Sequence, residues 1–211
     1  MEKKDLKPAG VFKYFEEICQ VPRPSKKEEK MIAYLKAFGA KHNLETKVDE
    51  AGNVLIKKPA TPGKENLQTV VLQSHIDMVC EKNNDVQHDF LTDPIETEID
   101  GEWLKAKGTT LGADNGIGVA TELAILADDS IEHGPLECLF TVDEETGLTG
   151  AFALQEGFMS GDILLNLDSE DEGEIFIGCA GGIDSVAEFT YKEVEIPAGY
   201  SYRWYRQWDD L

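Results

Sequence analysis

The stretch TVVLQSHIDMV, residues 69–79, decides the fold, because a short apolar run suited to a buried central strand leads directly into a histidine and an aspartate. Two other apolar runs end in the same way. Residues 136–142 (LECLFTV) are followed by Asp143, Glu144 and Glu145, and residues 163–167 (ILLNL) are followed by Asp168. In an open α/β sheet, ligands and catalytic groups collect just beyond the carboxyl ends of the strands. The three runs therefore predict one functional site at a single edge of a sheet.

The rest of the chain predicts strands interleaved with helices, the pattern of an α/β fold with a central sheet. Val11, Phe12, Phe15 and Ile18 recur at helical spacing before two prolines. Ser25 followed by Glu28 has the pattern of a capping box, which predicts a helix over residues 26–42. The other predicted elements are strands at 44–48, 53–57, 174–178 and 185–194, a small strand pair around 103–104, helices ending at 126 and spanning 150–155, and a surface loop at 81–94.

The composition is that of a folded protein with an acidic surface. Apolar residues make up 41% of the chain and charged residues 29%, which excludes a disordered polymer. The formal net charge of -21 repels phosphates, so we expect neither nucleic acid nor an anionic membrane as a partner. The first ten residues contain no apolar signal segment, and the expected location is the cytoplasm. Four cysteines without a CxxC pair argue against a disulfide framework, and Cys138 and Cys179 are expected to be buried thiols.

His75 and Asp77 admit two interpretations. They are two residues apart, so on an extended strand end both side chains point to the same side. The structural interpretation is a hydrogen-bonded core histidine beside an aspartate that caps a helix. The functional one is a neutral imidazole that binds a metal while Asp77 orients the ring.

Asp143, Glu144 and Glu145 are three adjacent carboxylates directly after an apolar strand. They fit a solvated turn, or a helix N-terminus where acids favour the dipole. Like charges this close, however, resist joint ionisation unless a cation neutralises them. With a divalent cation present, one glutamate could be a ligand while its neighbour accepts a proton from water.

Asp114 and Asp168 complete the set of candidate ligands. Asp114 lies among glycines at the predicted start of a helix, either as its N-cap or as a carboxylate that bridges two metals, with the glycines letting the backbone pass close to them. Asp168 would be buried if it followed the strand pattern, and a lone buried charge needs a partner. Carboxylates with one histidine suit Zn²⁺, and Mn²⁺ or Co²⁺ are also acceptable. Two metals about 3.5–4 Å apart would activate a water and polarise a peptide carbonyl.

Four motifs, in order, resemble the aminoacyl-histidine dipeptidases, also called cytosol nonspecific dipeptidases, of the zinc aminopeptidase-like clan. The motifs are SHIDMV (74–79), GTTLGADNGIG (108–118), DEETGLTGA (143–151) and LLNLDSEDEGEIFIGCAGG (164–182), and VPRPSKKEE (21–29) is similar too. The resemblance implies a three-layer α/β/α catalytic domain with a mixed central sheet. It also implies hydrolysis of dipeptides with a free amino end, including Xaa-His substrates such as carnosine.

The resemblance further implies a role for each of six residues. His75 and Asp168 would bind one zinc ion, and Asp77 would orient His75. Asp114 would bridge the two metals, Glu145 would bind the other zinc ion, and Glu144 would be the general base.

The family pattern continues beyond this chain. Family members are longer, with a lid domain inserted after GCAGG and a fifth metal ligand, a histidine, in the catalytic segment that follows it; neither His88 nor His133 matches that motif. We therefore expect residues 1–185 to be the N-terminal part of the catalytic domain, incomplete at its C-terminal side. Residues 186–211 would be the start of the lid or an aberrant truncated tail, whose last dozen residues look out of frame. The resemblance implies a homodimer formed through the lid in full-length members.

Three functions stay open at this point. The chain could be a metallo-dipeptidase whose own activity is weak or undetectable. It could instead be a non-catalytic metal-binding fragment of such an enzyme. A related amidohydrolase or deacetylase is the third, because sister families share the HxD and EE patterns.

Overall fold

The structure is a computed structural model that describes residues 3–169, 171, 173–178, 181, 186–190, 192, 195 and 198–199. The chain divides into two units, Met1–Glu172 and Gly173–Leu211, and all the helices and strands below belong to the first. The predicted domain boundary at residue 185 stays a prediction. The unusual tail, residues 200–211, and Cys179 lie outside the described residues.

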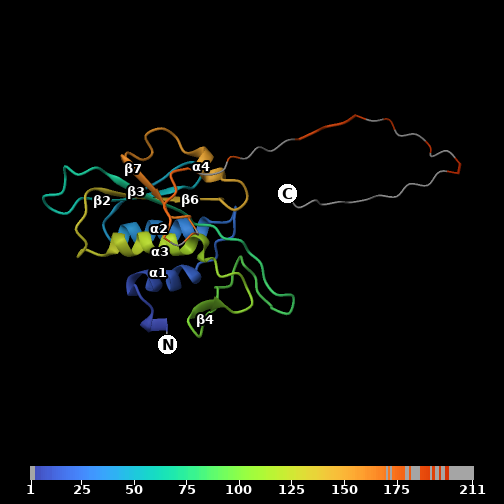
Figure 1. The fold of residues 1–211 in the computed structure, drawn as a ribbon, viewed down its shortest axis with the longest axis horizontal. Coiled ribbons are helices and arrows are strands. Elements are labelled where there is room, and N and C mark those ends of the chain that lie inside the picture. Colours follow the sequence, from blue (N-terminus) through green and yellow to red (C-terminus); the bar gives the residue numbers. More distant parts are fainter. Residues whose placement is uncertain are drawn as a thin grey trace. The chain divides into compact units, whose positions relative to one another are not determined.

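A five-stranded mixed sheet forms the centre of the first unit (Figure 1). Its strand order is β1-β2-β6-β3-β7, with β1–β2 and β2–β6 antiparallel and β6–β3 and β3–β7 parallel. The strands are β1 (Glu45–Val48), β2 (Val54–Lys58), β3 (Val70–His75), β6 (Leu136–Thr141) and β7 (Ile163–Asn166). Because β6, β3 and β7 are parallel neighbours, their carboxyl ends meet at one edge of the sheet. This arrangement confirms the mixed α/β fold predicted from the three apolar runs.

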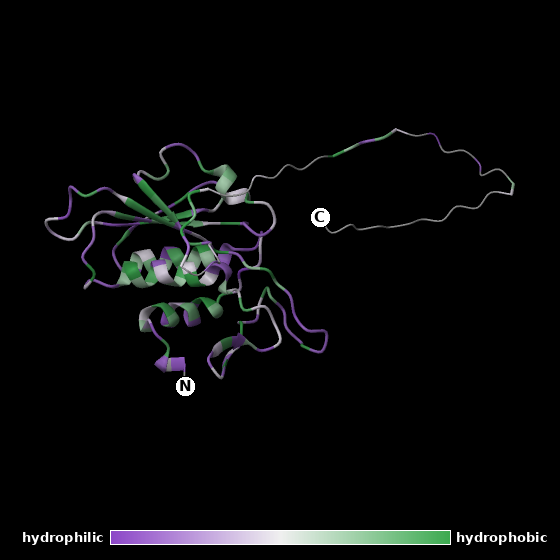
Figure 2. Cartoon of the chain, in the orientation of Figure 1, coloured by the Kyte–Doolittle hydropathy of each residue, from purple (hydrophilic) through white to green (hydrophobic). Residues whose placement is uncertain are grey.

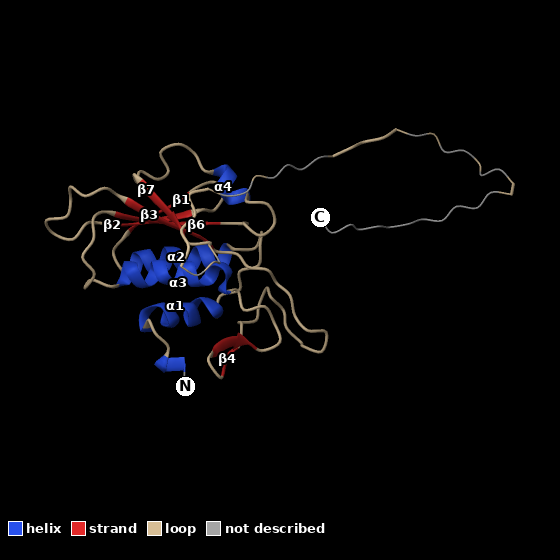
Figure 3. Ribbon diagram, in the orientation of Figure 1, coloured by secondary structure: helices blue, strands red, loops and turns tan. Residues whose placement is uncertain are grey.

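Helices cover the sheet unequally on its two faces. In Figures 1 and 3, α2 (Glu29–Lys41) and α3 (Ala113–Ala127) lie directly against one face, and α1 (Ala9–Cys19) packs outside them. The main core lies in this layer and includes Phe15, Met31 and Phe140. The opposite face carries the short helix α4 (Thr149–Ala153) and a small cluster in which Leu154, Phe158 and Met159 pack on Leu55, Val71 and Leu139. Figure 2 shows the strands as the most hydrophobic part of the sheet region, with hydrophilic loops around them.

Three smaller elements lie outside these layers. A short 3-10 helix, η1 (Lys3–Asp5), precedes α1, and β4 (Thr97–Asp100) pairs with β5 (Trp103–Ala106) in a separate two-stranded sheet. This pair confirms the small strand pair predicted around Trp103. Cys138 is fully buried, as predicted. Over the part of the chain described here, every helix is too short or too polar to cross a membrane.

Three local predictions are wrong over the described residues. The capping box does not form: α2 begins at Glu29 without a side-chain cap, because the hydroxyl of Ser25 donates to Asp77 and Glu28 accepts from the backbone N–H groups of Lys26 and Asp143. The predicted strand at 174–178 is absent, since these residues pair with no described strand and their apolar side chains are exposed. The described part of the predicted strand at 185–194, residues 186–190 and 192, also lacks strand structure.

Candidate metal centre

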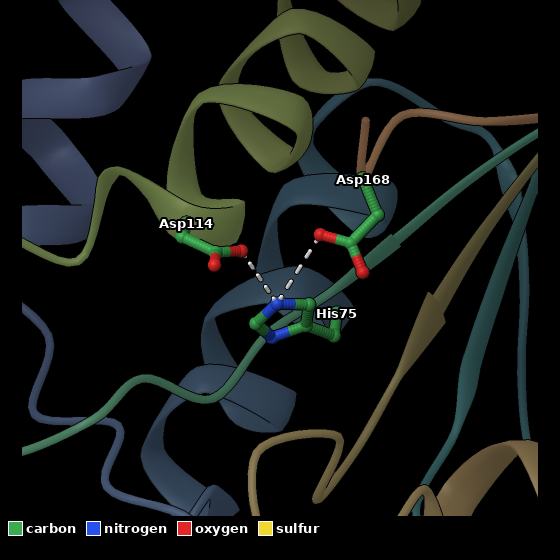
Figure 4. A group of neighbouring side chains, drawn as sticks. All are labelled: His75, Asp114 and Asp168. Carbon is green, nitrogen blue, oxygen red and sulfur yellow. Dashed lines mark hydrogen bonds and ion pairs between the residues drawn. The ribbon is translucent and has the colours of Figure 1, made fainter. Parts of the chain in front are cut away.

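The carboxyl ends of the parallel strands bring a histidine and two aspartates together. His75 is the last residue of β3, and its side chain is only 1% exposed. Its Nε2 atom lies 3.0 Å from Oδ1 of Asp114 and 3.5 Å from Oδ1 of Asp168. Figure 4 shows the two carboxylates converging on this nitrogen from the start of α3 and from the segment after β7. His75, Asp114 and Asp168 therefore form one group able to hold a metal ion.

Asp77 holds the other side of the imidazole ring. Its Oδ1 lies 3.2 Å from Nδ1 of His75, so a proton on Nδ1 leaves Nε2 facing Asp114 and Asp168. The fully buried carboxylate also accepts hydrogen bonds from the backbone N–H groups of Glu144 and Glu145 and from Ser25. Burial raises the pKa of Asp77, but the hydrogen bonds with His75, Glu144 and Ser25 outweigh it and lower the pKa to about 2. The helix-capping interpretation of Asp77 is wrong, because its carboxylate contacts His75 and the loop after β6 instead.

The surroundings of His75 favour a positive charge at this place. Burial lowers the pKa of the imidazole, but the hydrogen bonds with Asp168, Asp77 and Asp114 together raise it to about 10. One imidazole and several carboxylates are a donor set that suits a divalent cation such as Zn²⁺. The residues present therefore fit a metal ion.

Glu144 and Glu145 approach the same histidine from the loop after β6. His75, Glu144 and Glu145 each offer a ligand atom within 4.8 Å of the other two. Burial raises the pKa of both glutamates; the charge of His75 lowers it in part, and neighbouring carboxylates raise it further. The two half-buried glutamates thus lie beside His75 with raised pKa values, and their division into one ligand and one proton acceptor stays a prediction.

The third member of the acidic triplet, Asp143, has a structural role. It is buried, and its two oxygens accept hydrogen bonds from the hydroxyls of Thr146 and Thr149 at 2.6 and 2.5 Å. It therefore shapes the loop that carries Glu144 and Glu145.

One interpretation of Asp114 and the predicted burial of Asp168 are wrong. The N-cap of α3 is Gly112, and Asp114 has non-helical backbone angles, so the capping interpretation of Asp114 is wrong. Asp168 is 24% exposed rather than buried, because the side chains of the edge strand β7 are all exposed.

Asn115 is a site residue that the sequence did not predict. Its Nδ2 donates a hydrogen bond of 2.5 Å to Oδ1 of Asp168, the oxygen that faces His75. The two residues are 53 positions apart, so the only local signal was that Asn115 follows Asp114 directly. The hydrogen bond with His75 is the largest cause that lowers the pKa of Asp168; burial raises the pKa in part, and the bond from Asn115 lowers it further.

Comparison with known proteins assigns the family. Residues 71–205 match Peptidase family M20/M25/M40. The chain belongs to this peptidase family. It is 51% identical over 199 residues to the cytosol non-specific dipeptidase of Escherichia coli (strain K12), a match that covers 94% of this chain and 41% of that protein.

Solved structures of M20/M25/M40-like peptidases agree with the fold. The crystal structure of aminoacylhistidine dipeptidase from Vibrio alginolyticus matches with a TM-score of 0.80 and 56% identity, over 82% of this chain and 35% of that one. Aminopeptidase PepT from Bacillus cereus ATCC 10987 matches with a TM-score of 0.65 and 26% identity, over 77% of this chain and 43% of that one. The resemblance to aminoacyl-histidine dipeptidases is confirmed. The chain spans less than half the length of these relatives.

Proposed function

We propose that this chain is the metal-binding part of a dipeptidase that hydrolyses dipeptides with a free amino end, including Xaa-His dipeptides such as carnosine. The observation that carries the proposal is the buried imidazole of His75 at the end of a parallel strand, which five carboxylates approach. The names of the relatives from E. coli and V. alginolyticus support a dipeptide as the substrate.

We propose Zn²⁺ as the metal, with Mn²⁺ or Co²⁺ as substitutes, and His75, Asp114, Glu145 and Asp168 as the ligands. Two such ions, held by these residues, would supply the Lewis acidity that activates a water molecule and polarises the carbonyl of the peptide bond. Asp77 keeps His75 in the orientation that presents Nε2, and Asn115 holds Asp168 beside it.

Glu144 is the proposed general base. Its raised pKa lets it take the proton of the attacking water as the C–O bond forms and then give that proton to the leaving amine as the C–N bond breaks. No covalent intermediate with the chain is needed, because water is the nucleophile.

We propose as a second function that the chain binds metal with weak or undetectable turnover of its own. The groups of candidate ligands around His75 support metal binding by themselves. We also propose a cytoplasmic location, which the name of the E. coli relative supports. We propose neither nucleic acid nor a membrane as a partner, because the net charge of -21 repels phosphates. Assembly into a homodimer through a lid domain is proposed only for the longer members of the family.

Two measurements on the 211-residue protein test the proposal. Calorimetric titration with Zn²⁺ should show binding that His75→Ala abolishes, and incubation of the zinc-loaded protein with carnosine or Gly-His should release free amino acids slowly or below detection. Glu144→Gln should keep zinc binding and lower any turnover by about 10²–10⁴-fold. Glu132→Gln removes a charge from an exposed salt bridge with Lys64 and is the matched control.

The outcomes separate the functions. Absence of zinc binding refutes the proposed metal centre. Binding without turnover supports the non-catalytic function, and hydrolysis of N-acylated but not free-amino dipeptides would instead assign an amidohydrolase or deacetylase.

A further inference from the structure

One loop, between α1 and α2, contacts three of the segments that carry candidate site residues: those that bear His75, Asp114 and Glu144. Arg23 in this loop is 2% exposed, and its guanidinium donates three hydrogen bonds to backbone carbonyls. Nη1 donates to the carbonyls of Ile76 and Asp77 at 3.1 and 2.9 Å, and Nη2 donates to the carbonyl of Gly112 at 2.5 Å. Arg23 therefore joins the segment after His75 to the segment that leads into Asp114.

Two further side chains of the same loop contact Asp77 and the acidic triplet Asp143–Glu145. The hydroxyl of Ser25 donates to Oδ2 of Asp77 at 2.7 Å, on the carboxylate that orients His75. Oε1 of Glu28 accepts from the backbone N–H of Asp143 at 3.0 Å, at the start of the loop that carries Glu144. A backbone bridge between Pro24 and Met78 adds a main-chain contact to these side-chain bonds.

The carboxylates of Glu28, Asp77 and Asp143 lie within 4.8 Å of one another, yet they are a hydrogen-bonded support rather than a further metal site. Donors of the chain already occupy both oxygens of Asp77, both oxygens of Asp143 and Oε1 of Glu28. These donors are the hydroxyls of Ser25, Thr146 and Thr149 and the backbone N–H groups of residues 26, 143, 144 and 145.

The glycines beside Asp114 make room for this arginine. A Cβ atom on Gly112 would lie 2.5 Å from Nη2 of Arg23, and one on Gly116 would lie 2.7 Å from the same atom. Gly112 also has a φ of 68°, in the left-handed region. The motif GADNG thus wraps its backbone around the guanidinium, which explains two of its glycines better than close approach to a metal does.

We propose that Arg23, Ser25 and Glu28 form a positioning clamp for the metal centre. The clamp fixes the end of β3, the start of α3 and the loop after β6 at the separation that the ligands need. None of its members is proposed to touch the metal or the substrate. The inference deepens the proposed function and rests on it. Partners that orient metal ligands in this way typically change metal affinity by about 10–100-fold when removed.

The test is a titration of the 211-residue protein with Co²⁺, followed by the visible absorption bands that report the geometry around this ion. Ser25→Ala should weaken Co²⁺ affinity about 10–100-fold and alter the absorption spectrum. Ser25→Thr keeps the hydroxyl and should restore both affinity and spectrum to nearly those of the parent chain. Ser130→Ala is the matched control, because that hydroxyl also bonds an aspartate, Asp128, but at the far end of α3.

Arg23→Lys provides a second variant that keeps the charge but loses the fork of donors, and it should also shift the Co²⁺ spectrum. A parent chain that binds no Co²⁺ would refute the proposed function and the clamp with it. A parent chain that binds Co²⁺, with Ser25→Ala and Arg23→Lys matching it in affinity and spectrum, would refute the clamp alone. Urea unfolding of the metal-free variants shows whether they are folded; rescue by threonine establishes the clamp even if Arg23→Lys does not fold.

Discussion

Replacing Glu122 with glutamine should make the stability of this protein less sensitive to pH. Glu122 lies on the face of α3 that packs on the sheet, its side chain is fully buried, and neither of its carboxyl oxygens has a hydrogen-bond partner among the described residues. Burial raises its pKa well above 4.5, and the nearby Ser74 hydroxyl and Cys138 thiol offset only part of this effect. Burial without a charged partner therefore favours the neutral form of this carboxyl in the folded protein.

The sign and size of the effect follow from linkage. A carboxyl whose pKa is higher in the folded than in the unfolded state contributes its full share of stability below the unfolded pKa of about 4.5 and loses it as pH rises toward the folded pKa. Each pH unit in that window costs about 1.4 kcal/mol. Between pH 5 and pH 7, the free energy of unfolding should therefore fall more in the parent chain than in Glu122→Gln, by at most about 2.7 kcal/mol.

Urea unfolding followed by circular dichroism at pH 5, 6 and 7 measures this difference directly. The other titrating groups are common to both proteins, so the difference between parent and variant isolates Glu122. Glu29→Gln, on the exposed surface of α2, controls for the loss of one negative charge. A difference that stays constant within about 0.5 kcal/mol across these pH values would show that Glu122 is ionised in the folded protein and would refute the reasoning.

Three further predictions concern the backbone around the site and the edge of the sheet. Gly112→Ala should lower the free energy of unfolding by about 1–3 kcal/mol, because the new Cβ meets Arg23 at a positive φ. Gly63→Ala is the control, because Gly63 has a φ of 85° but open space around it, and it should lower the free energy of unfolding by less in the same urea titration. Equal losses in the two variants would contradict the proposed collision with Arg23. Asn53→Ala should cost about 2–3 kcal/mol, since the buried amide bonds the backbone at both ends of the loop after β6; a change below 0.5 kcal/mol, on the order of a surface substitution, would exclude this role. Leu164→Lys should reduce self-association measured by sedimentation velocity, because the side chains of β7 form an exposed apolar edge; an unchanged sedimentation profile would show that this edge does not associate.

The sequence by itself determined the main elements and the place of the site. Apolar runs of strand length followed by polar residues predicted β3, β6 and β7, and the structure places His75, Glu144, Glu145 and Asp168 at the ends of these strands. This worked because burial imposes a local pattern on a central strand, and the chain must leave the sheet where that pattern ends. The prediction of a strand at 174–178 was wrong, because a strand forms only beside a partner strand, and the local pattern of residues does not specify that partner.

Only the tertiary structure decided which polar side chains meet. Ser25 and Glu28 have the local pattern of a helix cap. In the structure, however, Ser25 bonds Asp77, 52 residues away, and Glu28 bonds Asp143, 115 residues away. Arg23 gave no local signal, and its acceptors are carbonyls from two other segments. A hydrogen bond has a reach of about 3 Å in space and no limit in sequence. The ligand-bearing strand ends could therefore be predicted along the chain, whereas the groups that hold them in place became identifiable only when the chain was folded.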